Sequence, residues 1–81
     1  MNAEDIGRRL REELETILAR PLAEGDEQRP LHELGVDSIG LVELLVAIER
    51  EFKMPLLEAG LAADDFRTLA RLAEVIHARL P

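Results

Sequence analysis

Apolar residues recur at a helical spacing through residues 1–20 of the chain. The stripe follows a period of about 3.6 residues, and its members are Ile6, Leu10, Leu14, Ile17 and Leu18. Asn2 is a residue type that starts helices, and Pro21 disfavours a helical conformation at the residue before it. The pattern therefore predicts an amphipathic helix over residues 3–19.

Residues 20–37 lose this period because proline and glycine interrupt them, which predicts one long connection. Connections longer than about 12–15 residues are uncommon in compact domains and are often functional. Four residues of this segment are apolar, namely Leu22, Leu31, Leu34 and Val36. We expect these side chains to hold the loop against the helices.

A second helical pattern covers residues 38–52, and its apolar arc is wider than a single stripe. A wide arc predicts a central helix that packs on two sides. Lys53, shortly before Pro55, stands where a glycine commonly ends a helix. A left-handed conformation at this lysine costs about 1 kcal/mol, partly offset by its positive charge at the helix end.

The remaining residues predict one short and one longer element. Residues 56–67 combine apolar residues with Gly60 and two aspartates, which suits at most a short helix or turn. Thr68 then opens a run with apolar residues at helical steps, which predicts a helix over residues 68–79. We expect one all-α domain over residues 1–81, a small four-helix bundle of three main helices and one short helix, with a long loop between the first two.

The composition agrees with this expectation and excludes several classes of function. A chain of 81 residues with 47% apolar residues, 33% charged residues and no Tyr or Trp is typical of one soluble helical domain. The absence of cysteine excludes a disulfide framework, a thiolate zinc site and a cysteine nucleophile. The sequence has no run of roughly 18 apolar residues and no secretion signal at its start, so we expect a cytoplasmic protein without membrane contact.

The net charge of −7 argues against a nucleic-acid partner, since such binding depends on clustered Lys and Arg. Residues 21–66 concentrate the negative charge, with eleven acidic residues against three basic ones. This acidic belt would attract partners with basic surfaces. Many acidic proteins have the same balance, so the charge alone does not identify a binding surface.

Ser38 stands at the predicted start of the second helix, after Gly35-Val36-Asp37. The first turn of a helix has unpaired backbone N–H groups and the positive end of the helix dipole, so it would stabilise a phosphodiester on the Ser38 hydroxyl. The alternative is structural, because a helix cap at Asp37 or Ser38 contributes about 1 kcal/mol without any function. Position alone leaves both interpretations open.

The other candidates for chemistry are weaker. His32 lies six residues before Ser38 and is a candidate catalytic base, but we expect it to be an exposed histidine of the loop. We expect His77 at the surface. Asp64 and Asp65 could form a metal pair or an acid and base, yet they are more simply residues of a helix start. The sequence has no glycine-rich phosphate loop, metal-ligand spacing or Ser-His-Asp arrangement, so we expect no enzyme.

Residues 34–52 carry a longer signature. They resemble the pattern L-G-x-D-S-L-x-x-V-E-L…L-E-E-E-F of acyl and peptidyl carrier proteins, and the flanking elements agree over nearly the whole chain. The matching residues are Leu34-Gly35-Val36-Asp37-Ser38-Ile39, Val42-Glu43-Leu44 and Ile48-Glu49-Arg50-Glu51-Phe52.

The resemblance implies a stand-alone carrier protein. A phosphopantetheinyl transferase would move 4′-phosphopantetheine from coenzyme A onto Ser38, beside Asp37, and the arm would hold cargo as a thioester. Ile39 would pack and contact partners, and the family's core positions fall on Val42, Leu44, Ile48 and Phe52. Loading, condensing or transferase enzymes would bind acidic residues of the second helix through basic patches on their own surfaces. These acidic residues are Glu43, Glu49 and Glu51.

Departures from the pattern bear on the cargo. Ile39 replaces a leucine, Arg50 interrupts the acidic row, and Gly40 and Lys53 differ from fatty-acid carriers, with Gly40 resembling discrete carriers of secondary metabolism. We therefore expect a monomeric carrier of polyketide, nonribosomal-peptide or aminoacyl intermediates, more than of primary fatty-acid synthesis. The alternative is an unmodified acidic helical adaptor in which Ser38 only caps a helix.

Overall fold

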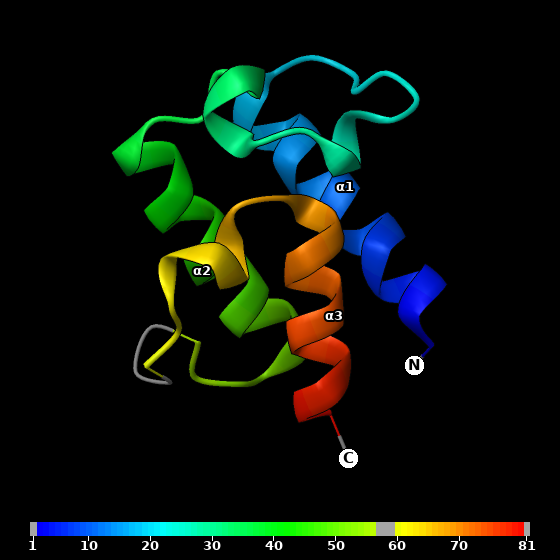
Figure 1. Ribbon diagram of the computed structural model, residues 1–81, viewed down its shortest axis with the longest axis vertical. Coiled ribbons are helices and arrows are strands. Elements are labelled where there is room, and N and C mark those ends of the chain that lie inside the picture. Colours follow the sequence, from blue (N-terminus) through cyan, green and yellow to red (C-terminus); the bar gives the residue numbers. More distant parts are fainter. Residues whose placement is uncertain (1, 57–59, 81) are drawn as a thin grey trace.

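Three α-helices and three 3₁₀ turns make up the described part of the chain, residues 2–56 and 60–80 of a computed structural model (Figure 1). The α-helices are α1 (Ala3–Leu18), α2 (Ser38–Phe52) and α3 (Leu69–Arg79). The 3₁₀ turns are η1 (Asp26–Gln28), η2 (Leu31–Leu34) and η3 (Ala63–Phe66). The predicted all-α fold is confirmed, and its short helix is the single turn η3. Residues 57–59 of the range predicted for that element lie outside the described residues.

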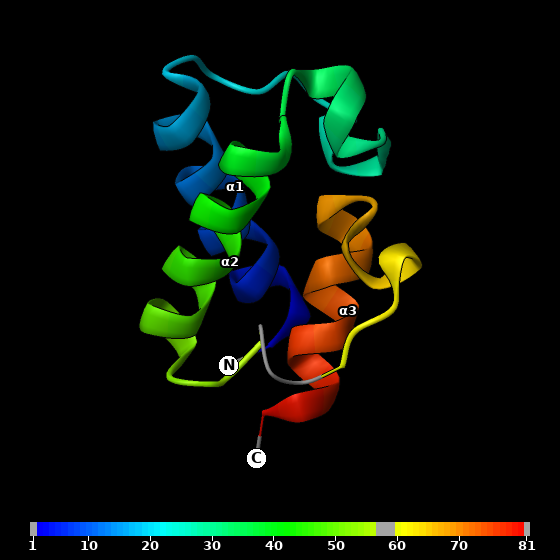
Figure 2. The same ribbon diagram turned by 90° about the vertical axis from the view of Figure 1, so that its left-hand side faces the viewer.

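Helix α1 is the helix that packs against both others, so the prediction that residues 38–52 form the central helix is wrong. Figure 2 shows α1 running behind α2 toward α3. Ile6, Leu10 and Leu14 of the apolar stripe of α1 are buried in the core with side chains of α2 and α3, and the other two members, Ile17 and Leu18, pack half-buried against it. One side of α2 packs in this core, while part of its wide apolar arc faces outward.

Two helices end on residues with left-handed backbone conformations that are not glycine. Helix α1 ends one residue earlier than predicted because Ala19 has φ 56° and the Arg20 N–H donates to the Glu15 carbonyl at 3.2 Å. Lys53 ends α2 with φ 54°, as predicted. Such an end satisfies the last carbonyl groups of a helix and fixes the direction in which the chain leaves it.

Helix α3 begins at Leu69, one residue after the predicted start. Thr68 has an extended backbone and caps the helix, because its side-chain oxygen accepts from the Arg71 N–H at 3.1 Å. In the described ranges no helix is long and apolar enough to cross a membrane.

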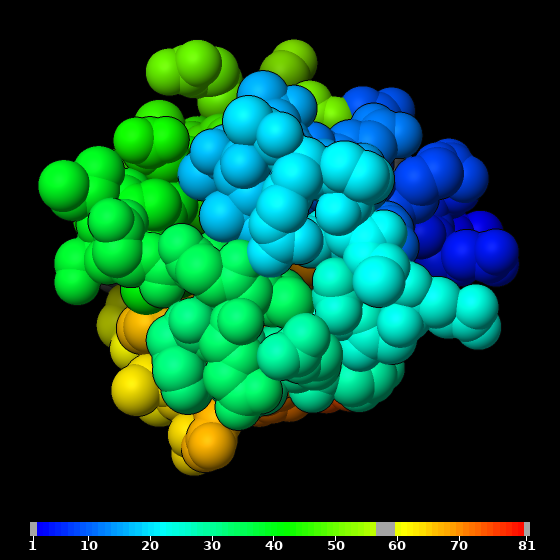
Figure 3. Space-filling view, turned by 90° about the horizontal axis from the view of Figure 1, so that it is seen from above, coloured from blue at the N-terminus to red at the C-terminus, as the bar shows by residue number. Residues whose placement is uncertain are grey.

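The long loop between α1 and α2 is fixed to the helices. Its four apolar residues are buried as predicted, and they are Leu22, Leu31, Leu34 and Val36. Sequence reasoning missed two arginines that bind the loop backbone. Arg11 of α1 donates to the Leu22 carbonyl at 2.6 Å and pairs with Glu27 at 2.5 Å. Arg20, just after α1, donates to the Leu34 carbonyl at 2.5 Å. Figure 3 shows the loop, coloured light blue to teal, covering this end of the molecule.

Gly7→Ala is expected to stabilise the protein by about 0.5–1 kcal/mol, because glycine inside a helix costs about that much relative to alanine. A Cβ at Gly7 meets no atom within 4 Å. Urea unfolding of the two proteins measures the difference. Gly40→Ala is the matched control and is expected to lack the gain, because its Cβ would lie 3.3 Å from the Asp37 carboxylate. An unchanged or lower free energy of unfolding in Gly7→Ala would contradict the prediction.

Candidate functional site

Gly35 and the buried Val36 connect the end of η2 to the start of α2. Gly35 ends η2 with φ 99°, a conformation that residues with a side chain rarely adopt. Val36 follows with its side chain buried, and its N–H donates to the Leu31 carbonyl at 3.1 Å. Ser38 is then the first residue of α2, and it is exposed. The loop therefore places this residue at a fixed point of the surface.

Asp37 caps the helix. One of its carboxylate oxygens accepts from the Gly40 N–H at 2.7 Å, and its carbonyl accepts from the Leu41 N–H at 2.9 Å. The Ser38 hydroxyl makes no hydrogen bond with the described residues. The interpretation in which Ser38 itself is the cap is therefore wrong, because the carboxylate of Asp37 occupies that role.

Asp37→Ala is expected to lower the free energy of unfolding by about 1 kcal/mol, the usual effect of losing a side-chain cap. Asp37→Ser should retain most of the stability, since serine also caps helices well. Urea unfolding at constant temperature measures both variants. Equal stability of Asp37→Ala and the parent protein would contradict the assignment of the cap.

A cavity of about 400 Å³ opens beside Ser38, between the start of α2 and the segments η2 and η3. Its apolar walls include Leu31, Leu41 and Phe66, and its polar walls include His32 and Arg67. The Leu31 N–H donates to the Arg67 carbonyl at 2.9 Å, which joins the two sides of the cavity. In Figure 3 the teal-to-green residues border the yellow-to-orange ones.

His32 is an exposed residue of the long loop, as predicted. His32 and Arg67 line the same cavity as Ser38, a neighbourhood that the sequence did not predict. The backbone hydrogen bond from Leu31 of η2 to Arg67, just before α3, connects segments that are remote in sequence. No periodicity or motif signals such a contact.

Asp65 and Arg71 hold η3 to α3. The Asp65 carboxylate accepts from the Ala62 N–H at 3.0 Å and pairs with Arg71 at 3.0 Å. The pKa of Arg71 is raised by its hydrogen bond to Glu74 and, next, by the one to Asp65. Asp65 is therefore a residue of the start of η3, and not of the start of the last helix beside Thr68, where the sequence places it. Asp64 is exposed and lies on the wall of the cavity.

Helix α2 exposes two large apolar side chains near Ser38. Ile39 is 70% exposed and Val42 is 51% exposed. The expected core position of Val42 and the expected packing of Ile39 are therefore wrong, because α1 covers a different side of α2. Leu44 and Ile48 are buried and Phe52 packs half-buried against the core, as expected.

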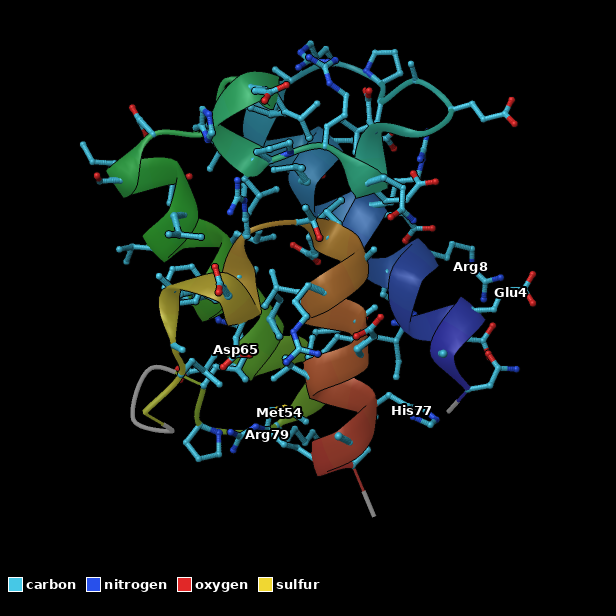
Figure 4. All side chains as sticks on the ribbon, in the orientation of Figure 1. Glu4, Arg8, Met54, Asp65, His77 and Arg79 are labelled. Atoms are coloured by element: carbon cyan, nitrogen blue, oxygen red, sulfur yellow. The ribbon has the colours of Figure 1, made fainter. Side chains whose placement is uncertain are left out.

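The acidic residues of α2 differ in their surroundings. Glu43 is exposed one turn after Ile39, whereas Glu49 and Glu51 are half-buried. Glu51 pairs with Arg9 of α1, which counters its charge. His77 is exposed as predicted, on α3 near the end opposite the start of α2 (Figure 4). The exposed negative charge nearest to Ile39 on this helix therefore belongs to Glu43.

Comparison with known protein families gives a match over most of the chain. The sequence profile described as "Phosphopantetheine attachment site" matches residues 8–76, which include the long loop, all of α2 and most of α1 and α3. The comparisons with curated proteins and with solved structures found no match. The chain therefore belongs to the phosphopantetheine attachment-site family, and it is a non-catalytic carrier-protein domain whose prosthetic group is 4′-phosphopantetheine.

Proposed function

We propose that Ser38 is the residue that carries the prosthetic group. A phosphodiester linkage needs a hydroxyl, and the sequence has one serine, two threonines and no tyrosine. The Thr16 hydroxyl donates to the Glu12 carbonyl at 3.1 Å, and the Thr68 oxygen accepts from the Arg71 N–H. Ser38 is exposed, and its hydroxyl makes no hydrogen bond with the described residues. This difference among the three hydroxyl groups is the observation that carries the proposal.

The start of α2 suits a phosphodiester. The first N–H groups of a helix have no partner within the helix, and among the described residues Asp37 accepts those of Gly40 and Leu41. The N–H groups of Ser38 and Ile39 are left to donate to phosphate oxygens at the positive end of the helix dipole. The exposure of Ser38 also lets a modifying enzyme reach its hydroxyl.

The modification is a phosphoryl-type transfer. The Ser38 oxygen forms a bond to the phosphorus that carries the pantetheine part of coenzyme A, and the bond from this phosphorus to the nucleotide breaks. The nucleotide leaves as 3′,5′-ADP, and a base of the transferase takes the hydroxyl proton. The attached group supplies a thiol that holds an acyl group as a thioester, a thiol that this cysteine-free chain does not contain itself.

Intact mass spectrometry after incubation with coenzyme A and a broad-specificity phosphopantetheinyl transferase tests the proposal. We expect the protein to gain one phosphopantetheinyl group. If the protein stays unmodified while a known carrier protein in the same tube is modified, the proposal is wrong and an acidic adaptor becomes the better interpretation.

Carrier proteins of this family are modified by phosphopantetheinyl transferases and interact with the enzymes of their pathway. We propose that partner enzymes bind this chain mainly at Ile39 and Glu43, because both side chains are exposed on α2 close to Ser38. Glu49 and Glu51 contribute less charge to a partner, since both are half-buried. Loading, condensing or transferase enzymes would complement this surface with a basic patch around an apolar pocket.

Ile39→Asp is expected to lower kcat/KM for loading by the transferase roughly tenfold, because the loss of an apolar contact of 1–2 kcal/mol at an interface has about that effect. Loading rates followed by mass spectrometry measure it. Ala78→Asp is the control, since it adds the same charge to an exposed position at the end of α3. Equal rates for Ile39→Asp and Ala78→Asp would remove Ile39 from the recognition surface.

We also propose that the thioester cargo belongs to secondary metabolism. This assignment is supported by three residues that depart from the pattern of fatty-acid carriers, which are Gly40, Arg50 and Lys53. The test offers the modified protein to a malonyl-loading enzyme of fatty-acid synthesis and, separately, to amino-acid-activating and polyketide-loading enzymes. Loading by the first enzyme alone would overturn the assignment.

A further inference from the structure

Arg67 is a positive side chain on the wall of the cavity beside Ser38. It lines the same cavity as Ser38, it is exposed, and its guanidinium makes no ion pair or hydrogen bond with the described residues. Arg71, a few residues later, pairs with both Asp65 and Glu74. Arg67 is therefore available to a group that enters the cavity.

The backbone of Arg67 is held in place although its side chain is not engaged. Its carbonyl accepts from the Leu31 N–H at 2.9 Å, and the next residue, Thr68, caps α3. Its own N–H lies 3.5 Å from the Asp64 carbonyl at the end of η3. These contacts hold the base of the side chain on the wall of the cavity that Ser38 also lines.

The side chains around the cavity carry charges that would act on a negatively charged phosphodiester attached to Ser38. Besides Arg67, the polar residues that line it are His32, Asp37, Asp64 and Ser38. Two of these are carboxylates, so a further negative charge on Ser38 would be repelled. The Asp37 carboxylate already accepts from the Gly40 N–H. Among the residues that line the cavity, Arg67 is the one with a permanent positive charge.

We propose that Arg67 binds the phosphodiester of the arm on Ser38, an inference that rests on the proposed function. A guanidinium has several donors in a fixed plane and matches two oxygens of a phosphate group. The phosphodiester accepts from Arg67 on one side and from the first N–H groups of α2 on the other. Arg67 thereby acts as a positioning residue that directs the first bonds of the arm across the cavity toward η3.

Phosphorus NMR of the modified protein tests this inference. The samples are the parent protein, Arg67→Ala, Arg67→Lys and the control Arg79→Ala, which removes an exposed arginine at the far end of α3 (Figure 4). We expect the ³¹P signal of the phosphodiester to shift in Arg67→Ala, to return part of the way in Arg67→Lys, and to coincide with the parent in Arg79→Ala.

Salt gives a second readout that a merely structural role would not move. At 1 M salt the screening length falls to about 3 Å, so the ³¹P signal of the parent is expected to move toward that of Arg67→Ala. The signal of Arg67→Ala should move much less over the same range.

The outcomes separate this inference from the proposed function. A phosphodiester signal that is the same in the parent protein and Arg67→Ala overturns the inference and leaves Ser38 as the attachment residue. No protein-bound phosphodiester signal in any sample, with a known carrier protein modified in parallel, overturns the proposed function and this inference with it.

Discussion

Ser38→Ala is expected to abolish the gain of a phosphopantetheinyl group while the fold persists. The variant removes the hydroxyl to which the group would be bonded. The free energy of unfolding should change by less than about 0.5 kcal/mol, because Ser38 is exposed and the cap belongs to Asp37. Intact mass spectrometry measures the loading, and urea unfolding measures the stability.

The two threonines provide the controls for this experiment. Thr16→Ala and Thr68→Ala should still gain one group, since both hydroxyl groups are engaged in the structure. Loading that persists in Ser38→Ala and disappears in a threonine variant would contradict the assignment of Ser38. A large loss of stability in Ser38→Ala would contradict the assignment of the cap to Asp37.

Leu31→Ala is expected to lower the free energy of unfolding by about 2–5 kcal/mol, the usual cost of truncating a buried leucine. Leu31 is 5% exposed, and it joins the long loop to the start of α3 through its N–H. A domain of 81 residues has a stability of about 4–12 kcal/mol. The variant should therefore lose a large part of its stability, and the loop that positions Ser38 should become mobile.

Urea unfolding and backbone amide exchange test the effect of Leu31→Ala. Exchange of the Gly35 and Val36 amides, whose N–H groups donate to carbonyls of η2, should accelerate more than that of α3. Leu80→Ala is the control, because Leu80 is half-buried at the end of α3 and should cost clearly less. Equal losses in the two variants would show that the loop does not depend on Leu31.

The sequence was sufficient for the three α-helices and for the position of Ser38 at the start of α2. The apolar spacing predicted α2 with its observed bounds, and the left-handed Lys53 after it. The buried residues of the loop could be predicted because four apolar side chains in a connection have to be covered somewhere. These features depend on neighbours in the chain, which a sequence pattern records.

The errors concern contacts between remote segments. A wide apolar arc shows which face of α2 is hydrophobic, and it does not show whether this chain supplies a partner for all of that face. The carrier-protein pattern likewise implies a core position for Val42, which is 51% exposed. Arg67 was not recognised as a neighbour of the cavity, since that depends on how η2 meets the start of α3. The choice between Asp37 and Ser38 as cap likewise needed the geometry.

Locating the modification within the chain determines whether Ser38 carries the prosthetic group. Cleavage after glutamate gives a peptide of residues 34–43, in which Ser38 is the one residue with a hydroxyl. After incubation with coenzyme A and the transferase, tandem mass spectrometry should find the phosphopantetheinyl group on this peptide. A modified protein whose group lies on a peptide that contains Thr16 or Thr68, with residues 34–43 unmodified, would contradict the account.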